Sequence, residues 1–256
     1  MSFNRESRGY LVFGTFLFVV LEILLVVAII WWPSFEKNIA ALKEMAGFLP
    51  MLVEQLNIIE TIGVPGYVVA QHYFKACNAL GTAAAVLFAM GAIAGEAQRG
   101  TMEIWLARPV TRRRLYTERY LYGMLALWIP VFLSSFTIPA LLGLVDESMG
   151  YRELALCSLH QSLFLGSIYS VTFMLSAFGS APIKIAFVML FGCIFEFALY
   201  MVKTLTHWSA FRLSDIETYA RILSEKSLDW PVAGGIVGIT LISYWCGLAV
   251  FQRRTP

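Results

Sequence analysis

Charged residues are scarce in this chain of 256 residues. They account for 14% of the sequence, whereas hydrophobic residues account for 59%. A soluble domain carries about 25% charged residues, so the composition argues against a soluble globular protein. The charges that are present cluster between long apolar runs, as a chain that crosses a bilayer requires.

Signatures of nucleotide and disulfide chemistry are also missing. The chain has no GxxxxGK[ST] phosphate-binding loop and no soluble stretch long enough for a nucleotide-binding domain. Its cysteines form no CxxC pair, and each lies in or near an apolar run. We therefore expect them to pack as small apolar residues. They are Cys77, Cys157, Cys193 and Cys246.

Long apolar runs are what the sequence has in abundance. Six of them approach or exceed the roughly 20 residues that cross the hydrocarbon core of a bilayer. We therefore predict an all-α polytopic membrane protein, with residues 1–256 forming one six-span domain. The first run is too long for a signal peptide and lacks a cleavage site, so we expect it to remain as a span. The predicted spans are 9–32, 76–95, 121–145, 154–178, 185–202 and 231–251.

The distribution of Lys and Arg predicts the orientation. With both termini in the cytoplasm, the inner segments hold eleven basic residues against four acids, and the outer segments hold eight against eleven. This bias satisfies the positive-inside rule. We therefore expect a multi-pass protein of the inner (cytoplasmic) membrane with membrane lipid around it. The inner basic residues are Arg5, Arg8, Arg99, Arg108, Arg112, Arg113, Arg114, Arg119, Lys184, Arg253 and Arg254.

The three histidines give no sign of a metal centre. His72, His160 and His207 lack the spacing of a metal site, and all fall at outer ends of spans or in outer segments. We expect them to be interfacial residues. This chain is therefore expected to have no catalytic site and to bind no cofactor or metal. Its net charge of +2 is too small to indicate a partner, and we expect no nucleic acid.

Two outer segments, 33–75 and 203–230, are long enough to fold. In the first, Ser34 can cap a helix that Gly47 and Pro50 limit, and a second short helix can run from Met51 to Thr61.

The second outer segment carries the pattern of an amphipathic helix. Ser214 and Glu217 have the spacing of a capping box, and apolar residues follow at helical spacing. We predict a helix over Asp215–Ser227 that lies on the outer surface. A re-entrant arrangement of Thr204–Trp230 is the alternative. The apolar face consists of Ile216, Tyr219, Ala220 and Leu223.

The inner segment 96–120 carries the most specific pattern. Gly100 can break the helix that leaves the membrane, and Thr101 can cap a new helix that starts at Met102. Met102, Trp105 and Leu106 would give this helix one apolar face, and Pro109 would end it. The segment therefore predicts a short helix across the cytoplasmic mouth, suited to docking on a soluble partner.

This segment resembles the ABC-2 type permeases, the membrane subunits of a class of ABC transporters. The family pattern has Glu after the second span, then Gly-Thr, Leu and Pro-Val-Ser/Thr-Arg. Arg119 stands near the position where the family usually has Lys, a mild departure. The chain end 251–254, with its Phe and paired Arg, and the outer Gly63 and Gly66-Tyr67 are also similar. The matching positions are Glu96, Gly100-Thr101, Leu106 and Pro109-Val110-Thr111-Arg112.

The resemblance implies the architecture and partners of a half-transporter. Two such subunits, in a homodimer or heterodimer, would form the pathway. A separate ABC ATPase would bind ATP and Mg and would dock on the coupling loop. The implied coupling residues are Glu96, Arg99, Gly100, Thr101, Glu103, Trp105, Leu106, Arg108, Pro109 and Arg112.

A few residues inside the spans suggest further roles. Glu22 and Glu196 lie within predicted spans, where a carboxylate is costly, so each is a candidate for the translocation path or a paired contact between helices. Pro130 and Pro139 are expected to kink the third span. The GxxxG pairs at 91/95 and 234/238 allow close helix approach. The few charges in the spans favour a lipidic or amphipathic cargo.

Two other functions remain open on the sequence. A membrane anchor that transmits force with an ATPase but moves no substrate fits the same pattern. An intramembrane enzyme would need a clustered nucleophile and base or a set of metal ligands at one depth. Glu22, Glu196 and the scattered cysteines do not form such a cluster.

Overall fold

The computed structural model describes residues 3–107 and 109–254, although not the side chains of residues 3–7 and Trp105. Every regular element in these residues is helical. Besides α-helices there is one π-helix, η1, and three 3-10 turns, η2 to η4. The elements are α1 (Phe3–Met45), α2 (Pro50–Ile62), α3 (Val64–Val68), η1 (Val69–Gly81), α4 (Thr82–Met90), α5 (Ala94–Gln98), α6 (Met102–Leu106), α7 (Arg112–Leu142), η2 (Gly143–Val145), α8 (Tyr151–Phe178), α9 (Pro182–Met201), η3 (Thr206–Trp208), η4 (Ala210–Ser214), α10 (Ile216–Glu225) and α11 (Trp230–Arg253).

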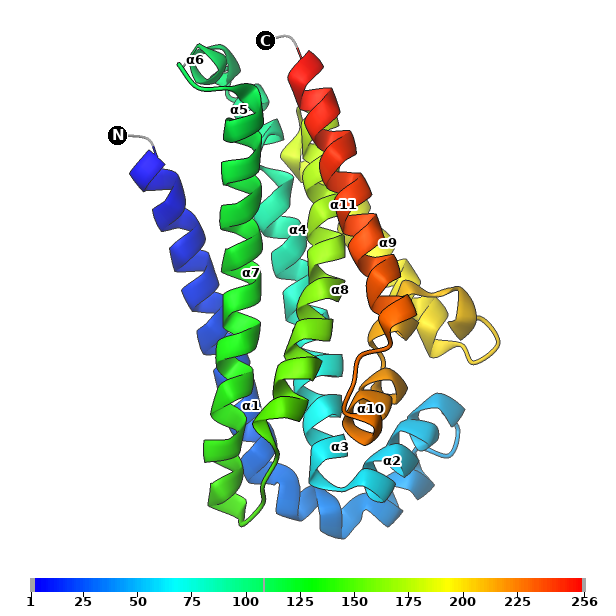
Figure 1. The fold of residues 1–256 in the computed structure, drawn as a ribbon. Helices are drawn as coiled ribbons and strands as arrows, with labels where there is room; N and C mark the ends of the chain where they lie inside the picture. The colour runs from blue at the N-terminus through cyan, green and yellow to red at the C-terminus, as the bar shows by residue number, and fades with distance from the viewer. Residues whose placement is uncertain (1–2, 108, 255–256) are drawn as a thin grey trace.

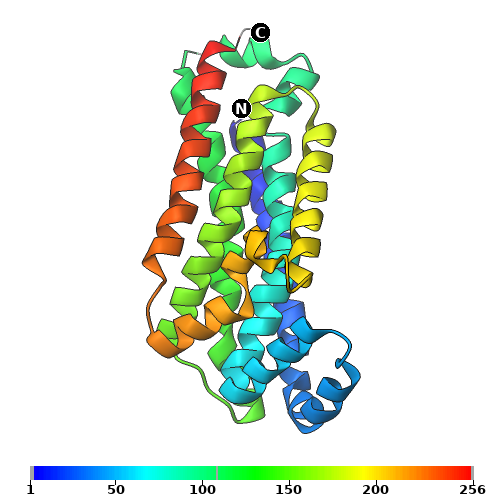
Figure 2. The same ribbon diagram turned by 90° about the vertical axis from the view of Figure 1, so that its right-hand side faces the viewer.

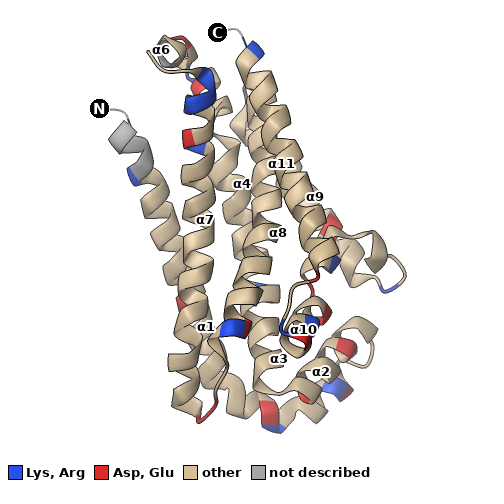
Figure 3. Cartoon of the chain, in the orientation of Figure 1, with Lys and Arg blue, Asp and Glu red and all other residues tan. Residues whose placement is uncertain are grey.

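The helices form one elongated bundle (Figures 1 and 2). One end carries α6 and both ends of the described chain, and we call it the terminal end. The other carries α2, α3 and α10, and we call it the loop end. Six stretches of helix are long and apolar enough to cross a membrane, which is compatible with a multi-pass membrane protein. Figure 3 shows Lys, Arg, Asp and Glu gathered towards the two ends of the bundle.

The centre of the bundle is formed by α8 and by the continuous run of α3, η1 and α4. In the apolar windows of these two spans 67% of the residues are buried, against 11% in α9. Helix α8 packs against α11, α4 and α7, and α1 packs against α7. One face of α1 is buried, but its other face and most of α9 expose large apolar side chains, as expected of helices that face lipid. Helix α9 is therefore a peripheral span.

The first helix differs from the prediction. Helix α1 runs without a break through Pro33 to Met45, so Ser34 does not cap a second helix. The Ser34 carbonyl instead accepts a hydrogen bond from Asn38 at 2.7 Å within the helix. The distal part of α1 packs on α2, and Lys43 forms an ion pair with Glu60 there. This tertiary contact extends the helix beyond the apolar run.

The second span is also displaced from its predicted range of 76–95. It covers Val64–Met90 and begins after Gly63, whose φ of 76° separates α2 from α3. The first half contains polar residues such as His72, which is fully buried inside the bundle. Hydropathy alone misses the polar half of a span whose polar side chains find partners in the interior.

The outer helix predicted over Asp215–Ser227 exists as α10, with two corrections. Its N-cap is Asp215, whose side chain accepts a hydrogen bond from the Thr218 amide at 2.8 Å, so the predicted Ser214 cap is wrong. The helix does not merely lie on the surface, because Ile216, Tyr219 and Ile222 are buried against the bundle. It packs on α2, α8 and η1.

Close helix approach occurs at glycines other than the two GxxxG pairs. A Cβ on any of those four glycines would meet nothing within 4 Å. A Cβ on Gly123 would collide with the hydroxyl of Tyr169, and a Cβ on Gly247 would collide with the hydroxyl of Tyr116. At Gly14 it would lie 3.0 Å from the carbonyl oxygen of Ala126, which has no helical amide to bond because Pro130 follows four residues later. Both Pro130 and Pro139 lie inside the unbroken α7.

Two of the three histidines are not at the interface. His72 is enclosed by η1 and α7, with Nε2 lying 3.3 Å from Ser134 Oγ and 3.4 Å from Ser135 Oγ. His160 Nε2 lies 2.6 Å from the Leu213 carbonyl. Both side chains are buried. Both imidazoles thus lie inside the bundle and not on its surface.

Candidate functional site

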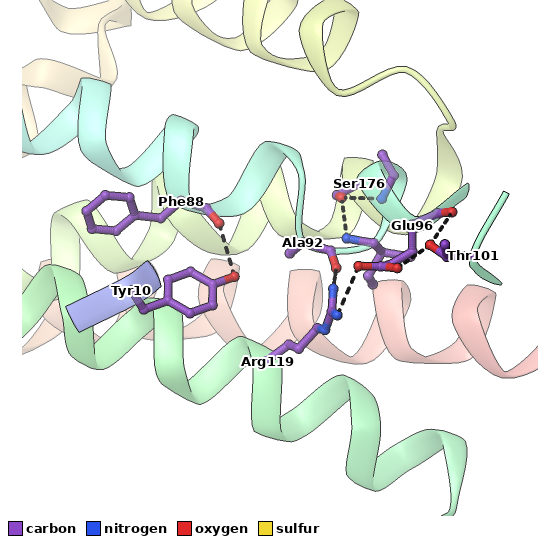
Figure 4. A network of polar contacts seen from close by, with 9 residues as sticks. Tyr10, Phe88, Ala92, Glu96, Thr101, Arg119 and Ser176 are labelled. Atoms are coloured by element: carbon purple, nitrogen blue, oxygen red, sulfur yellow. Dashed lines mark hydrogen bonds and ion pairs between the residues drawn. The ribbon is translucent and has the colours of Figure 1, made fainter. Parts of the chain in front are cut away.

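The site begins where the second span ends. Helix α4 stops at Met90, and α5 starts at Ala94 in a new direction. Ser176 of α8 bridges this break, since its hydroxyl accepts from the amides of Ile93 and Ala94 at 3.0 Å and donates to the Met90 carbonyl at 3.0 Å. The bend is thus held by bonds that replace those of the interrupted helix (Figure 4).

Glu96 is the centre of the polar contacts beyond the bend. Its Oε1 lies 3.2 Å from Nη2 of Arg119 on α7, and its Oε2 accepts a hydrogen bond from the Thr101 hydroxyl. Arg119 also donates to the Ala92 carbonyl. We call Ala92, Glu96, Thr101, Arg119 and Ser176 the Glu96 cluster. It joins α5 and the turn after it to α7 and α8 (Figure 4).

Burial and charge act in opposite directions on Glu96. The side chains of Glu96 and Arg119 are only 15% and 9% exposed. Burial by itself would raise the pKa of Glu96, but the hydrogen bond from Thr101 and the positive charge of Arg119 outweigh it and hold the pKa below its usual value. Glu96 is therefore ionised at neutral pH, and the ion pair is intact.

The loop from Glu96 to α6 follows the predicted path with one difference. Gly100 breaks the helix with a φ of 67°, a left-handed conformation that favours glycine. Helix α6 spans Met102–Leu106 as predicted. Thr101 precedes it, but its side chain makes no capping hydrogen bond. The hydroxyl bonds to Glu96 instead, so the expected capping role is wrong.

Met102 and Leu106 of the predicted apolar face of α6 are not exposed. Met102 is 4% exposed and belongs to the core of the bundle, and Leu106 is half-buried. Ile104 is 70% exposed and lies beside exposed Glu103. Among the described side chains of α6, the exposed apolar one is therefore Ile104. The side chain of Trp105 and all of Arg108 lie outside the described residues.

The Pro-Val-Thr-Arg stretch connects α7 to the end of the chain. Thr111 caps α7, since its hydroxyl accepts from the Arg114 amide at 3.3 Å. Arg112 donates to the carbonyls of Gln252 and Arg254 at 2.9 and 2.7 Å. Arg254 donates in turn to the Ala177 carbonyl at the end of α8. The loop is thus bonded to α7, α8 and α11, whereas Arg99 and Pro109 are exposed.

The two carboxylates proposed for a translocation path are far from this site and have separate partners. Glu22 of α1 accepts a hydrogen bond from Thr137 of α7 at 3.1 Å. Glu196 of α9 accepts from the Ala210 amide at 2.9 Å, which holds the turn after α9. Each is half-buried. These contacts give both residues a structural role, and their part in a pathway stays a prediction.

The sequence reasoning missed a polar network at the loop end. Asn78 of η1 donates to the Ser214 carbonyl at 2.9 Å and accepts from Gln161 of α8 at 2.9 Å. Tyr219 of α10 donates to the Gln161 side chain. All four side chains are buried. The signal in the sequence was an amide inside each of two apolar runs, at Asn78 and Gln161, since such groups need polar partners in a membrane.

Replacement of Gly100 tests the turn in this loop. Gly100→Ala should cost about 1 kcal/mol of stability because an alanine is strained in the left-handed conformation. Gly95→Ala is the matched control, since Gly95 is helical and a Cβ there meets nothing. The free energy of unfolding in mixed micelles measures both. Equal stability of the two variants would contradict a strained turn at Gly100.

Comparison with known proteins places the chain in no family. No family model, no curated protein and no solved structure matches it.

Proposed function

We propose that this chain is the transmembrane permease subunit of an ABC-2 type exporter. In this proposal a separate ATPase subunit hydrolyses ATP, and two permease subunits form the pathway. The terminal end lies in the cytoplasm and the loop end outside the inner membrane. The chain itself carries out no bond chemistry. The segment 96–112, with α6 at its centre, receives the movement of the ATPase.

The observation that carries the proposal is the bonding of the exposed α6 region to the spans. Glu96 and Arg119 tie the start of the segment to α7, and Ser176 ties the bend to α8. Arg112 ties its end to the last residues of α11 and beyond. A force applied to α6 therefore reaches three spans through short, directed contacts. An ordinary inner turn, made basic only for topology, would not need these contacts.

Exposed Ile104 provides a sharp test. Affinity purification of the tagged chain from mild detergent should recover an ATPase subunit, and Ile104→Glu should abolish that recovery. Leu144→Glu is the matched control, because Leu144 is also 70% exposed but lies at the loop end. Introducing a charge into the centre of a contact costs far more than it does on a free surface.

Each outcome of this purification has a definite meaning. Loss of the ATPase with Ile104→Glu alone supports the docking of an ATPase on α6. Equal recovery with both variants contradicts the role of α6. If no ATPase subunit is recovered with the wild type in several mild detergents, the permease proposal is contradicted.

A second candidate is a membrane anchor that transmits force but moves no substrate. The contacts of Glu22 and Glu196 favour it, since each carboxylate already has a partner within the chain. Vesicles that contain the chain and its ATPase separate the two. ATP-dependent accumulation of a lipidic or amphipathic cargo supports the exporter, whereas ATP hydrolysis without accumulation of any cargo supports the anchor.

A further inference from the structure

A single cation lies between two apolar grooves on one side of the bundle. Lys75 is exposed, although its neighbours Phe74 and Ala76 on η1 are buried. It forms no ion pair with any residue that the structure describes. A charge on the lipid-facing side of a span is costly unless it reaches the bilayer surface or an opposite charge. An opposite charge for Lys75 is therefore not supplied by the residues that the structure describes.

The grooves beside Lys75 have the shape and polarity to take up a hydrocarbon chain. One lies between η1, α4 and α9 and has a volume of 450 Å³, and Ala79, Ala83 and Leu190 help to line it. The other lies between α1 and η1 and has a volume of 550 Å³. No Asp or Glu lines either groove within the described residues. The charge at the shared rim is thus purely positive.

Lys75 lies close to the end of α9. The neighbouring Phe74 ring lies 5.4 Å from the Tyr200 ring, next to the end of α9 at Met201. Trp208 in the turn just after α9 is 74% exposed, as is typical of the interfacial belt. From this level the first groove runs inward along α9 from Phe197 to Leu190, about 10 Å at 1.5 Å per residue.

We propose that the groove between η1, α4 and α9 binds an anionic phospholipid. Its phosphate pairs with the Lys75 ammonium, and one acyl chain lies along Ala79 and Leu190. The positive charge of Lys75 at the rim favours a negatively charged headgroup. The apolar walls of the groove hold the acyl chain of the lipid. The site does not depend on an ATPase, so it can be tested on the purified chain alone.

Native mass spectrometry of the detergent-purified chain measures this binding directly. Phosphatidylglycerol should bind more tightly than phosphatidylcholine with the same acyl chains. Lys75→Gln should weaken phosphatidylglycerol binding about fivefold, the share of one lysine at an anionic surface. Lys184→Gln is the matched control, since Lys184 is exposed at the opposite end of α9 and should change binding little. Equal binding of the two lipids, or no effect of Lys75→Gln, overturns the proposal.

Protection of a native thiol places the lipid in this groove. Cys193 lines the groove and is half-buried, whereas Cys246 is the exposed cysteine. In a Cys246→Ser background, phosphatidylglycerol should slow alkylation of Cys193 by N-ethylmaleimide, and phosphatidylcholine should do so less. Lipid binding without protection overturns the assignment to this groove. If Cys193 is protected without lipid, and the protection increases with protein concentration, a second copy of the protein covers the groove. That result also overturns the proposed lipid site.

Discussion

Glu96→Ala should lower the free energy of unfolding by about 3 kcal/mol. Removal of this carboxylate leaves Arg119 as a charge that is only 9% exposed and has lost its acidic partner, and breaking one side of a buried pair typically costs this much. The Thr101 hydroxyl loses its acceptor as well. Reversible unfolding in mixed micelles measures the loss. In the proposed complex, the variant should also lose the stimulation of ATP hydrolysis by cargo.

The matched control is the exposed pair of Arg114 and Glu118 on α7. Its side chains are 68% and 29% exposed, so Glu118→Ala should cost no more than about 0.5 kcal/mol. The double variant Glu96→Leu/Arg119→Met should recover much of the lost stability, because no unpaired charge remains. A loss for Glu96→Ala that does not exceed the loss for Glu118→Ala would contradict a stabilising ion pair.

The pKa of Glu96 adds a pH signature to the same variant. Because the pKa is lowered in the folded protein, the contribution of this group is fully present above the usual value of 4.5 and is lost as pH falls through the lowered pKa. Acidification below pH 4.5 should therefore destabilise the wild type more than Glu96→Ala. If the free energies of unfolding of the wild type and of Glu96→Ala fall equally with pH, Glu96 is not the source of the acid sensitivity.

Asn78→Leu should lower the free energy of unfolding by about 2 kcal/mol and loosen the packing of the segment between α9 and α11. The substitution keeps a similar shape but leaves the Ser214 carbonyl and the Gln161 amide without Asn78. Hydrogen bonds between helices in membranes contribute about 0.6 kcal/mol each on average and up to about 1.7, and buried groups left unpaired add to the loss. Hydrogen exchange of the α10 amides should accelerate.

Asn57→Leu serves as the control for this substitution. Asn57 is an exposed residue of α2 at the same end of the bundle, so it should leave both stability and exchange almost unchanged. If the α10 amides exchange equally slowly in both variants, the network does not hold this segment in place.

Short-range patterns predicted the parts of the fold that depend on local physics. Six spans were identified because each carries enough consecutive apolar residues to match the bilayer thickness. The break at Gly100 and the start of α6 at Met102 followed from backbone freedom at glycine. Helix α10 followed from its apolar periodicity. These features need only neighbours a few residues away.

Features that need distant partners escaped the same reasoning. The pair of Glu96 and Arg119 joins residues on two different elements, and the resemblance only suggested a basic residue near that position. Met102, predicted to lie on the apolar face of α6, is instead drawn into the core of the bundle. Asn78 and Gln161 are 83 residues apart in the chain. Composition cannot show which polar groups meet.

The sequence by itself determined that this chain forms helices long and apolar enough to cross a membrane, because burying backbone polar groups in lipid leaves few other structures. It also determined where the chain turns at the terminal end. Only the tertiary structure decided how far α1 and the second span extend, which polar side chains pair, and that Lys75 meets no acid among the described residues. Those outcomes depend on packing between helices, where a buried polar group is tolerated only if another helix brings its partner.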